Sequence, residues 1–177
     1  MHLLLLPIFY LLGSIPAAYL VGMLLHGIDI REYGSGNVGT MNTRAVLGWG
    51  AAILVFLLDT GKGMLAVYIA NIAGVNPYLA LLLTVTGDIY PIWLKGRGGK
   101  GLAAALGGLL LEPQLLPTLI FCIIWVCFYL PTRDSDIAGF TASLAFIAVV
   151  AWKGSLPGKL WLVLLGIVVA WRHFCEV

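Results

Sequence analysis

Long apolar blocks dominate this sequence and leave few folds open to it. Seven blocks follow one another, and most of them approach the length of a membrane-crossing helix. In chain order they cover residues 3–25, 51–70, 78–94, 102–111, 115–130, 137–151 and 160–171. Because about 20 apolar residues in a helix cross a hydrocarbon core of roughly 30 Å, the blocks predict an all-α polytopic integral membrane protein. We expect about seven transmembrane helices, one of them short.

The composition leaves no room for a soluble domain. Apolar residues make up 61% of the chain and charged residues only 10%, against about 45–50% and about 25% in soluble domains. We therefore expect a single transmembrane domain over residues 1–177. No basic stretch precedes the first block and no small-residue cleavage site ends it, so we expect that block to be retained as a helix.

Composition also narrows the classes of ligand. The formal charge of +2 is too small to indicate nucleic acid as a partner. The three cysteines show neither the spacing of a metal site nor that of a disulfide framework. We expect the lipid bilayer as a partner, with no metal and no cofactor.

The fourth block, residues 102–111, is too short to cross a bilayer unaided, since ten helical residues rise about 15 Å. It is either re-entrant or crosses with the help of residues 98–101. If all seven blocks cross, Lys and Arg divide seven to two between the sides. The larger group is Arg31, Arg44, Lys95, Arg97, Lys100, Arg133 and Arg172, and the smaller is Lys153 and Lys159.

Cytoplasmic loops carry an excess of Lys and Arg, so the richer side is predicted to be cytoplasmic and the N-terminus external. If the fourth block does not cross, the later charges change sides and the division is again seven to two. Charge alone therefore leaves six or seven crossings open.

The first connection, residues 31–44, is rich in glycine and polar side chains. Gly34, Gly36 and Gly39 leave backbone amides accessible, which suits a chain that wraps an anion. The donors that accompany them are Ser35, Asn37, Asn42 and Arg44, the last with a planar fork that fits phosphate oxygens. A phosphate site and a flexible connector explain this pattern equally well.

A second basic connection leads directly into the short fourth block. Its cations are Lys95, Arg97 and Lys100, and its glycines are Gly96, Gly98, Gly99 and Gly101. Glycines before a helix start favour an anion site, because free N–H groups and the positive end of the helix dipole meet there. A positive-inside anchor would explain the cations but not the glycines, so we favour phosphate binding. No Ser or Thr follows Lys100, so this is not the soluble P-loop.

Charged residues inside the predicted helices are candidates for site support. Asp59 and Lys62 lie three apart and share a helix face, as a structural ion pair or as substrate contacts. Asp88, near the end of the third block, either pairs with Lys95 or Lys100 or is a solvated helix-end charge. His173 ends the last block and is either an interfacial anchor or a catalytic group.

Taken together, these motifs resemble the bacterial acyl-phosphate-dependent glycerol-3-phosphate acyltransferase family, known as PlsY. The resemblance covers nearly the whole chain. It rests on residues 13–16 (Gly-Ser-Ile-Pro), residues 34–39 with Asn42, Asp59 with Lys62 and Gly63, residues 95–101, and Arg172 with His173.

The resemblance implies seven transmembrane helices, an external N-terminus and a cytoplasmic active site in the bacterial cell membrane. The implied reaction transfers an acyl group from acyl phosphate to the 1-hydroxyl of glycerol 3-phosphate, giving lysophosphatidic acid and phosphate. By position, Ser35 would orient the substrates, and Lys100 would neutralise phosphate and polarise the acyl carbonyl. His173 would contact the same phosphate, and Arg44 completes the catalytic set. The resemblance also implies a functional link to an enzyme that forms acyl phosphate, and no protein nucleophile.

Four positions depart from the family pattern. Asp88 replaces a histidine, Met41 replaces a threonine, and Glu176 replaces an asparagine shortly before the chain ends. Arg44 follows Asn42 by two residues rather than three. The alternative function is therefore a divergent, non-enzymatic paralogue that binds or transports a phospholipid or phosphate metabolite. Because carboxylates repel phosphate, we expect Asp88→His and Glu176→Asn to strengthen glycerol 3-phosphate binding.

Overall fold

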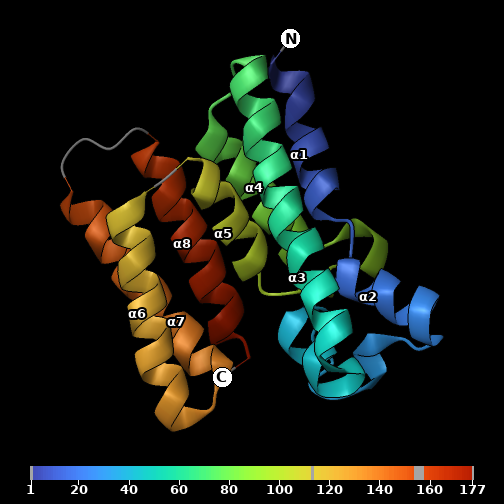
Figure 1. The fold of residues 1–177 in the computed structure, drawn as a ribbon. Helices are drawn as coiled ribbons and strands as arrows, with labels where there is room; N and C mark the ends of the chain where they lie inside the picture. Colours follow the sequence, from blue (N-terminus) through green and yellow to red (C-terminus); the bar gives the residue numbers. More distant parts are fainter. Residues whose placement is uncertain (1, 113, 154–157, 177) are drawn as a thin grey trace.

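In the computed structural model, which describes residues 2–112, 114–153 and 158–176, all regular secondary structure is helical (Figure 1). The α-helices are α1 Leu6–Gly13, α2 Ala17–Val21, α3 Thr40–Ala73, α4 Pro77–Ile89, α5 Leu102–Leu111, α6 Leu115–Thr132, α7 Ser135–Trp152 and α8 Lys159–Phe174. Shorter helical turns are His2–Leu5, Gly22–His26, Ile30–Glu32 and Ile92–Leu94. In Figure 1, α1, α3 and α4 form one group, α6, α7 and α8 form a second, and α5 lies between them.

The first apolar block is broken rather than continuous. Helix α1 ends at Gly13, α2 begins at Ala17, and the two segments are bent by 42°. Pro16 explains the break, because proline lacks an N–H and disfavours helical geometry in the residue before it. The carbonyls of Gly13 and Ile15 accept hydrogen bonds from the Lys62 ammonium at 3.1 and 3.0 Å. The break is therefore held by a charged side chain of α3.

Glycines bring helix backbones into direct contact. A Cβ on Gly13 would overlap the carbonyl of Thr84, and one on Gly87 would overlap the carbonyl of Tyr10, so α1 and α4 pack closely. A Cβ on Gly63 would likewise overlap the carbonyl of Ala104, where α3 meets α5. Small residues at such contacts are typical of membrane helix pairs, which have no hydrophobic driving force between them.

Helix α3 begins eleven residues before the predicted start of its block, at Thr40 rather than residue 51. Gly48 interrupts it with φ of 84°, a conformation that favours glycine. The end of the first glycine-rich connection is therefore helical, and it continues within α3 into the second apolar block.

The helices agree with a multi-pass protein, but their lengths do not fix the number of crossings. Four described helices are long and apolar enough to cross, and five if the bent α1–α2 pair is one span. Helix α5, with 10 residues, and α8, with 16, are shorter. Helix α6 is the most exposed span, with 6% of its apolar window buried, as expected of a lipid-facing helix. The number of seven crossings remains a prediction.

Candidate active site

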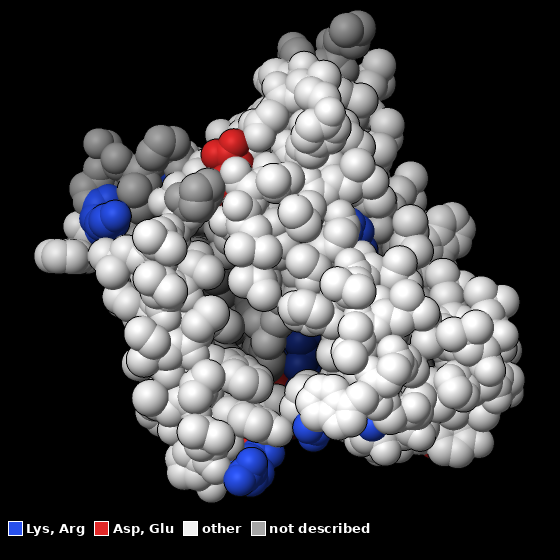
Figure 2. Space-filling model, viewed as in Figure 1, with Lys and Arg blue, Asp and Glu red and all other residues white. Residues whose placement is uncertain are grey.

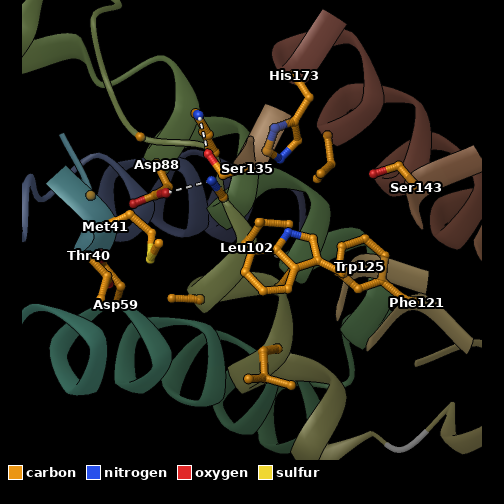
Figure 3. A pocket seen from close by; sticks show the side chains of 18 of the residues that line it. Thr40, Met41, Asp59, Asp88, Leu102, Phe121, Trp125, Ser135, Ser143 and His173 are labelled. Atoms are coloured by element: carbon orange, nitrogen blue, oxygen red, sulfur yellow. Dashed lines mark hydrogen bonds between the residues drawn. The ribbon is translucent and has the colours of Figure 1, made fainter. Parts of the chain in front are cut away.

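A cavity of about 390 Å³ opens between the two helix groups and combines a polar end with an apolar arm. The polar end is lined by side chains from five parts of the chain, namely Ser35, Asp88, Lys100, Asp136 and His173. The apolar arm is lined by Leu106, Leu109, Phe121, Trp125 and Phe146. In Figure 3, Phe121 and Trp125 lie together on one side, with Met41, Asp59 and Asp88 on the other.

Nine of the residues predicted for the site line this cavity, and seven do not. Those that line it are Ser35, Asn37, Gly39, Asn42, Asp59, Gly99, Lys100, Gly101 and His173. Those outside the lining are Gly34, Gly36, Arg44, Lys62, Lys95, Arg97 and Gly98. The two glycine-rich connections therefore meet at one cavity.

Asn42 holds the first glycine loop in shape. Its side-chain oxygen accepts a hydrogen bond from the Ser35 amide at 2.9 Å, and its Nδ2 donates to the carbonyls of Ile30 and Tyr33, both at 3.1 Å. Gly34 has φ of 60°, and a Cβ there would overlap the Asn42 oxygen. Because the Asn42 amide group is used inside the loop, the Ser35 hydroxyl and the Asn37 side chain are polar groups that this loop presents to the cavity.

The second glycine loop binds the carboxylate of a residue of the same chain, Asp88. Gly99 N–H donates to the Asp88 carbonyl at 3.0 Å, and Gly101 N–H donates to the Asp88 carboxylate at 3.1 Å. Gly98 N–H donates to the Ile89 carbonyl at 3.1 Å. The amides before α5 that were expected to bind phosphate are therefore paired with the end of α4.

Lys62 is the centre of a buried charge cluster. Its ammonium lies 2.8 Å from the Asp59 carboxylate and 2.5 Å from that of Asp88. The predicted Asp59–Lys62 pair is confirmed. The predicted alternatives for Asp88, pairing with Lys95 or Lys100 or solvation at a helix end, are wrong. Helix α3 packs against α4 and places the Lys62 ammonium against the Asp88 carboxylate.

Lys100 and His173 meet at one carboxylate that sequence reasoning missed. Asp136 places Oδ1 2.6 Å and Oδ2 2.7 Å from the Lys100 ammonium, and Oδ1 2.9 Å from His173 Nδ1. Ser135 Oγ lies 3.2 Å from the same ammonium. Ser135 and Asp136 come just before the predicted start of an apolar block, where polar and charged residues are common in the connections between helices. No signal in the sequence linked them to residues 35 or more positions away.

Residues 2–112, 114–153 and 158–176 contain no candidate metal-binding cluster. No cluster of three or more His, Cys, Asp or Glu side chains there has an arrangement that could hold a metal ion.

Comparison with known proteins identifies the family. A family model described as glycerol-3-phosphate acyltransferase matches residues 3–176. A glycerol-3-phosphate acyltransferase of Gloeobacter violaceus is 40% identical over 173 residues, covering 93% of this chain and 83% of that protein. One from Symbiobacterium thermophilum is 40% identical over 168 residues, with the same coverage of both chains. The chain belongs to the glycerol-3-phosphate acyltransferase family.

Solved structures of this acyltransferase family share the fold. A crystal structure of PlsY, an integral membrane glycerol 3-phosphate acyltransferase, in its glycerol 3-phosphate form matches with a TM-score of 0.83 and 30% identity. The match covers 98% of this chain and 88% of that one. The lysophosphatidic acid form matches with a TM-score of 0.78. The predicted all-helical, multi-pass integral membrane fold is thereby confirmed.

Two of the residues that depart from the acyltransferase family pattern, Asp88 and Glu176, form ion pairs with nearby residues. Asp88 pairs with Lys62, and Glu176 forms an ion pair with Arg172, whose Nε also donates to the Gly99 carbonyl at 3.2 Å. Met41 lines the cavity. Glu176 is thus tied to the end of α8 beside the second glycine loop.

Three of the predicted cations lie away from the cavity. Arg44 stacks on the Trp49 ring, with its guanidinium carbon 5.1 Å from the ring centroid. Lys95 and Arg97 line a separate hollow with Arg31. The Arg31 guanidinium, hydrogen-bonded to Asp29, holds the pKa of that carboxyl below its usual range. Lys100 is accordingly the lysine that lines the main cavity.

Proposed function

We propose that this chain transfers an acyl group from acyl phosphate to the 1-hydroxyl of glycerol 3-phosphate, producing lysophosphatidic acid and inorganic phosphate. One observation carries the proposal: a single cavity joins a polar end, with Lys100 and the Ser35 loop, to an apolar arm between α5 and α6. A reaction between two phosphate compounds, one bearing an acyl chain, needs both parts in one site. Membership of the family supports the same reaction.

The chemistry requires the site to position substrates rather than to supply a nucleophile. The glycerol oxygen attacks the acyl carbonyl carbon, the bond from that carbon to the phosphate oxygen breaks, and phosphate leaves with the electron pair. The hydroxyl proton passes to a phosphate oxygen. Lys100 neutralises charge on the leaving phosphate, and the Ser35 hydroxyl orients the acceptor. Acyl phosphate is already activated, so no cofactor enters the scheme.

We propose a cytoplasmic active site and an external N-terminus in the bacterial cell membrane, with residues 1–177 as one domain. The start of α1 and the end of α8 lie toward opposite ends of the molecule (Figure 1), as an odd number of crossings requires. Figure 2 shows most of the visible Lys and Arg side chains near the end of the molecule where the cavity opens. A basic membrane face is typical of the cytoplasmic side. There the enzyme would meet an acyl-phosphate-forming partner enzyme.

Removal of the Lys100 ammonium tests this function. Lys100→Ala should lower acyl transfer by about 10²-fold or more, the usual effect of deleting one group that stabilises transition-state charge. The variant and wild type are purified in the same detergent, and lysophosphatidic acid is measured at saturating substrates. Lys153→Ala is the control, because Lys153 is exposed and does not line the cavity. Near-wild-type turnover of Lys100→Ala would remove Lys100 from the mechanism.

A further inference from the structure

Asp136 lies where the proposed function needs an empty anion site. It belongs to the first turn of α7 and lines the cavity. One carboxylate takes contacts from the two groups that were assigned to phosphate, Lys100 from the start of α5 and His173 from the end of α8. Figure 3 shows Ser135 and His173 at this end of the cavity.

A lysine ammonium and a histidine nitrogen are groups that can also bind phosphate oxygens. Each Asp136 oxygen lies within 2.7 Å of the Lys100 ammonium, and the ammonium charge is therefore already neutralised. The second ring nitrogen of His173, Nε2, is not accessible to a ligand, because it is buried, and it has no hydrogen-bond partner in the described part of the chain. The ring packs against α7, where a Cβ on Gly139 would overlap it. Nδ1, bound to Asp136, is thus the nitrogen of His173 that could reach a ligand.

Asp88 provides an internal comparison. Its carboxylate also occupies a predicted phosphate position, but the buried Lys62 ammonium and the Gly101 amide fix it from two sides. Within the described part of the chain, the Asp136 carboxylate has Lys100 and His173 as its partners, and its side chain is 17% exposed. Rotation about its Cα–Cβ bond would free both groups without moving a helix.

We propose that Asp136 occupies the phosphate position of the empty enzyme and must be displaced by the substrate phosphate, so that it sets phosphate affinity. The proposal rests on the proposed function and names a specificity residue for it. A phosphate dianion offers Lys100 and His173 more charge than the carboxylate that it replaces, whereas a monoanionic ligand gains nothing by the exchange. Asp136 therefore selects for dianionic phosphate groups.

Neutral substitutions at this position test the inference by direct binding. We would measure the Kd of glycerol 3-phosphate and of inorganic phosphate by calorimetry, for wild type, Asp136→Asn and Asp136→Ser in one detergent. We expect both variants to bind each ligand about tenfold more tightly, equivalent to about 1.4 kcal/mol. The apparent KM for glycerol 3-phosphate should fall in parallel.

Asp134→Asn is the matched control. Asp134 caps the same helix by accepting hydrogen bonds from the amides of Asp136 and Ile137, and it does not line the cavity. Asparagine retains the capping acceptor while removing the same charge two residues away. This variant should bind phosphate as wild type does. Tighter binding there as well would mean that general charge at the start of α7, and not Asp136, controls affinity.

Two further outcomes separate this inference from the function on which it rests. An unchanged or weaker Kd in both Asp136 variants, with a lower kcat, would overturn the inference and make Asp136 a positioning residue for Lys100 and His173. That result would leave acyl transfer by wild type intact. Absence of transfer by wild type would instead refute the proposed function, whatever the variants bind.

Discussion

The buried cluster of Asp59, Lys62 and Asp88 predicts an unequal response to two substitutions. Lys62→Met removes the only ammonium of the cluster and leaves two carboxylates facing each other, with side-chain exposures of 6% and 10%. It also leaves the carbonyls of Gly13 and Ile15 without their Lys62 hydrogen bonds at the α1–α2 break. Asp88→Asn keeps the Lys62–Asp59 pair and retains an oxygen that can accept from Gly101.

The expected magnitudes follow from these contacts. Removing one partner of a buried ion pair costs about 3–5 kcal/mol, because the remaining charge is left uncompensated. Losing a charge-assisted hydrogen bond while keeping a neutral one costs about 1–3 kcal/mol. At roughly 2–4 °C per kcal/mol for a chain of this length, Lys62→Met should lower Tm by about 6–20 °C. Asp88→Asn should lower Tm by clearly less.

The assay is thermal unfolding of both purified variants and wild type in one detergent at one pH. Lys153→Met supplies a control for loss of a lysine at an exposed position. If Lys62→Met were as stable as Asp88→Asn, or more so, Lys62 would not be the group that neutralises this cluster. The same contacts revise the expectation for Asp88→His, which should now destabilise the protein rather than strengthen substrate binding.

Three other predictions concern packing, the apolar arm and topology. Gly63→Ala should lower Tm, because its Cβ would overlap the Ala104 carbonyl where α3 meets α5, whereas Gly61→Ala has open space and should not. A higher or equal Tm for Gly63→Ala would contradict this packing. Cys122→Trp, at the cavity, should reduce transfer from long-chain more than from short-chain acyl phosphates, and Cys127→Trp, on the same helix outside the lining, should not. Equal effects of the two would argue against an acyl chain beside α6. Reporters fused to each end should place the N-terminus outside and the C-terminus inside, and both ends on one side would exclude seven crossings.

Properties of short segments were predictable from this sequence. Each apolar block corresponds to a helix or a helix pair, because hydrophobicity and length are local properties. The Asp59–Lys62 pair was predictable for the same reason, since residues three apart share a helix face. Even the break at Pro16 is a local effect, although the apolar run on both sides of it obscured the bend.

Partners distant in the chain were not predictable. Asp88 and Lys62 are 26 residues apart, and Asp136 lies 36 from Lys100 and 37 from His173. The glycine loop before α5 predicted an anion site, and the packing of α4 places the Asp88 carboxylate against the Gly101 amide there. Arg44 fits phosphate chemically, yet it stacks on Trp49 instead. Local sequence therefore indicated which residues are candidates for a site, whereas their partners depended on helix packing.

In the proposed reaction, one cavity binds both substrates and transfers the acyl group of acyl phosphate to glycerol 3-phosphate. The most direct measurement incubates the purified wild-type protein with both compounds and quantifies lysophosphatidic acid and inorganic phosphate together. We predict that the two products appear in equal amounts, and that neither appears above background when glycerol 3-phosphate is omitted. Phosphate release without lysophosphatidic acid, or no turnover by a correctly folded protein, would contradict the claim.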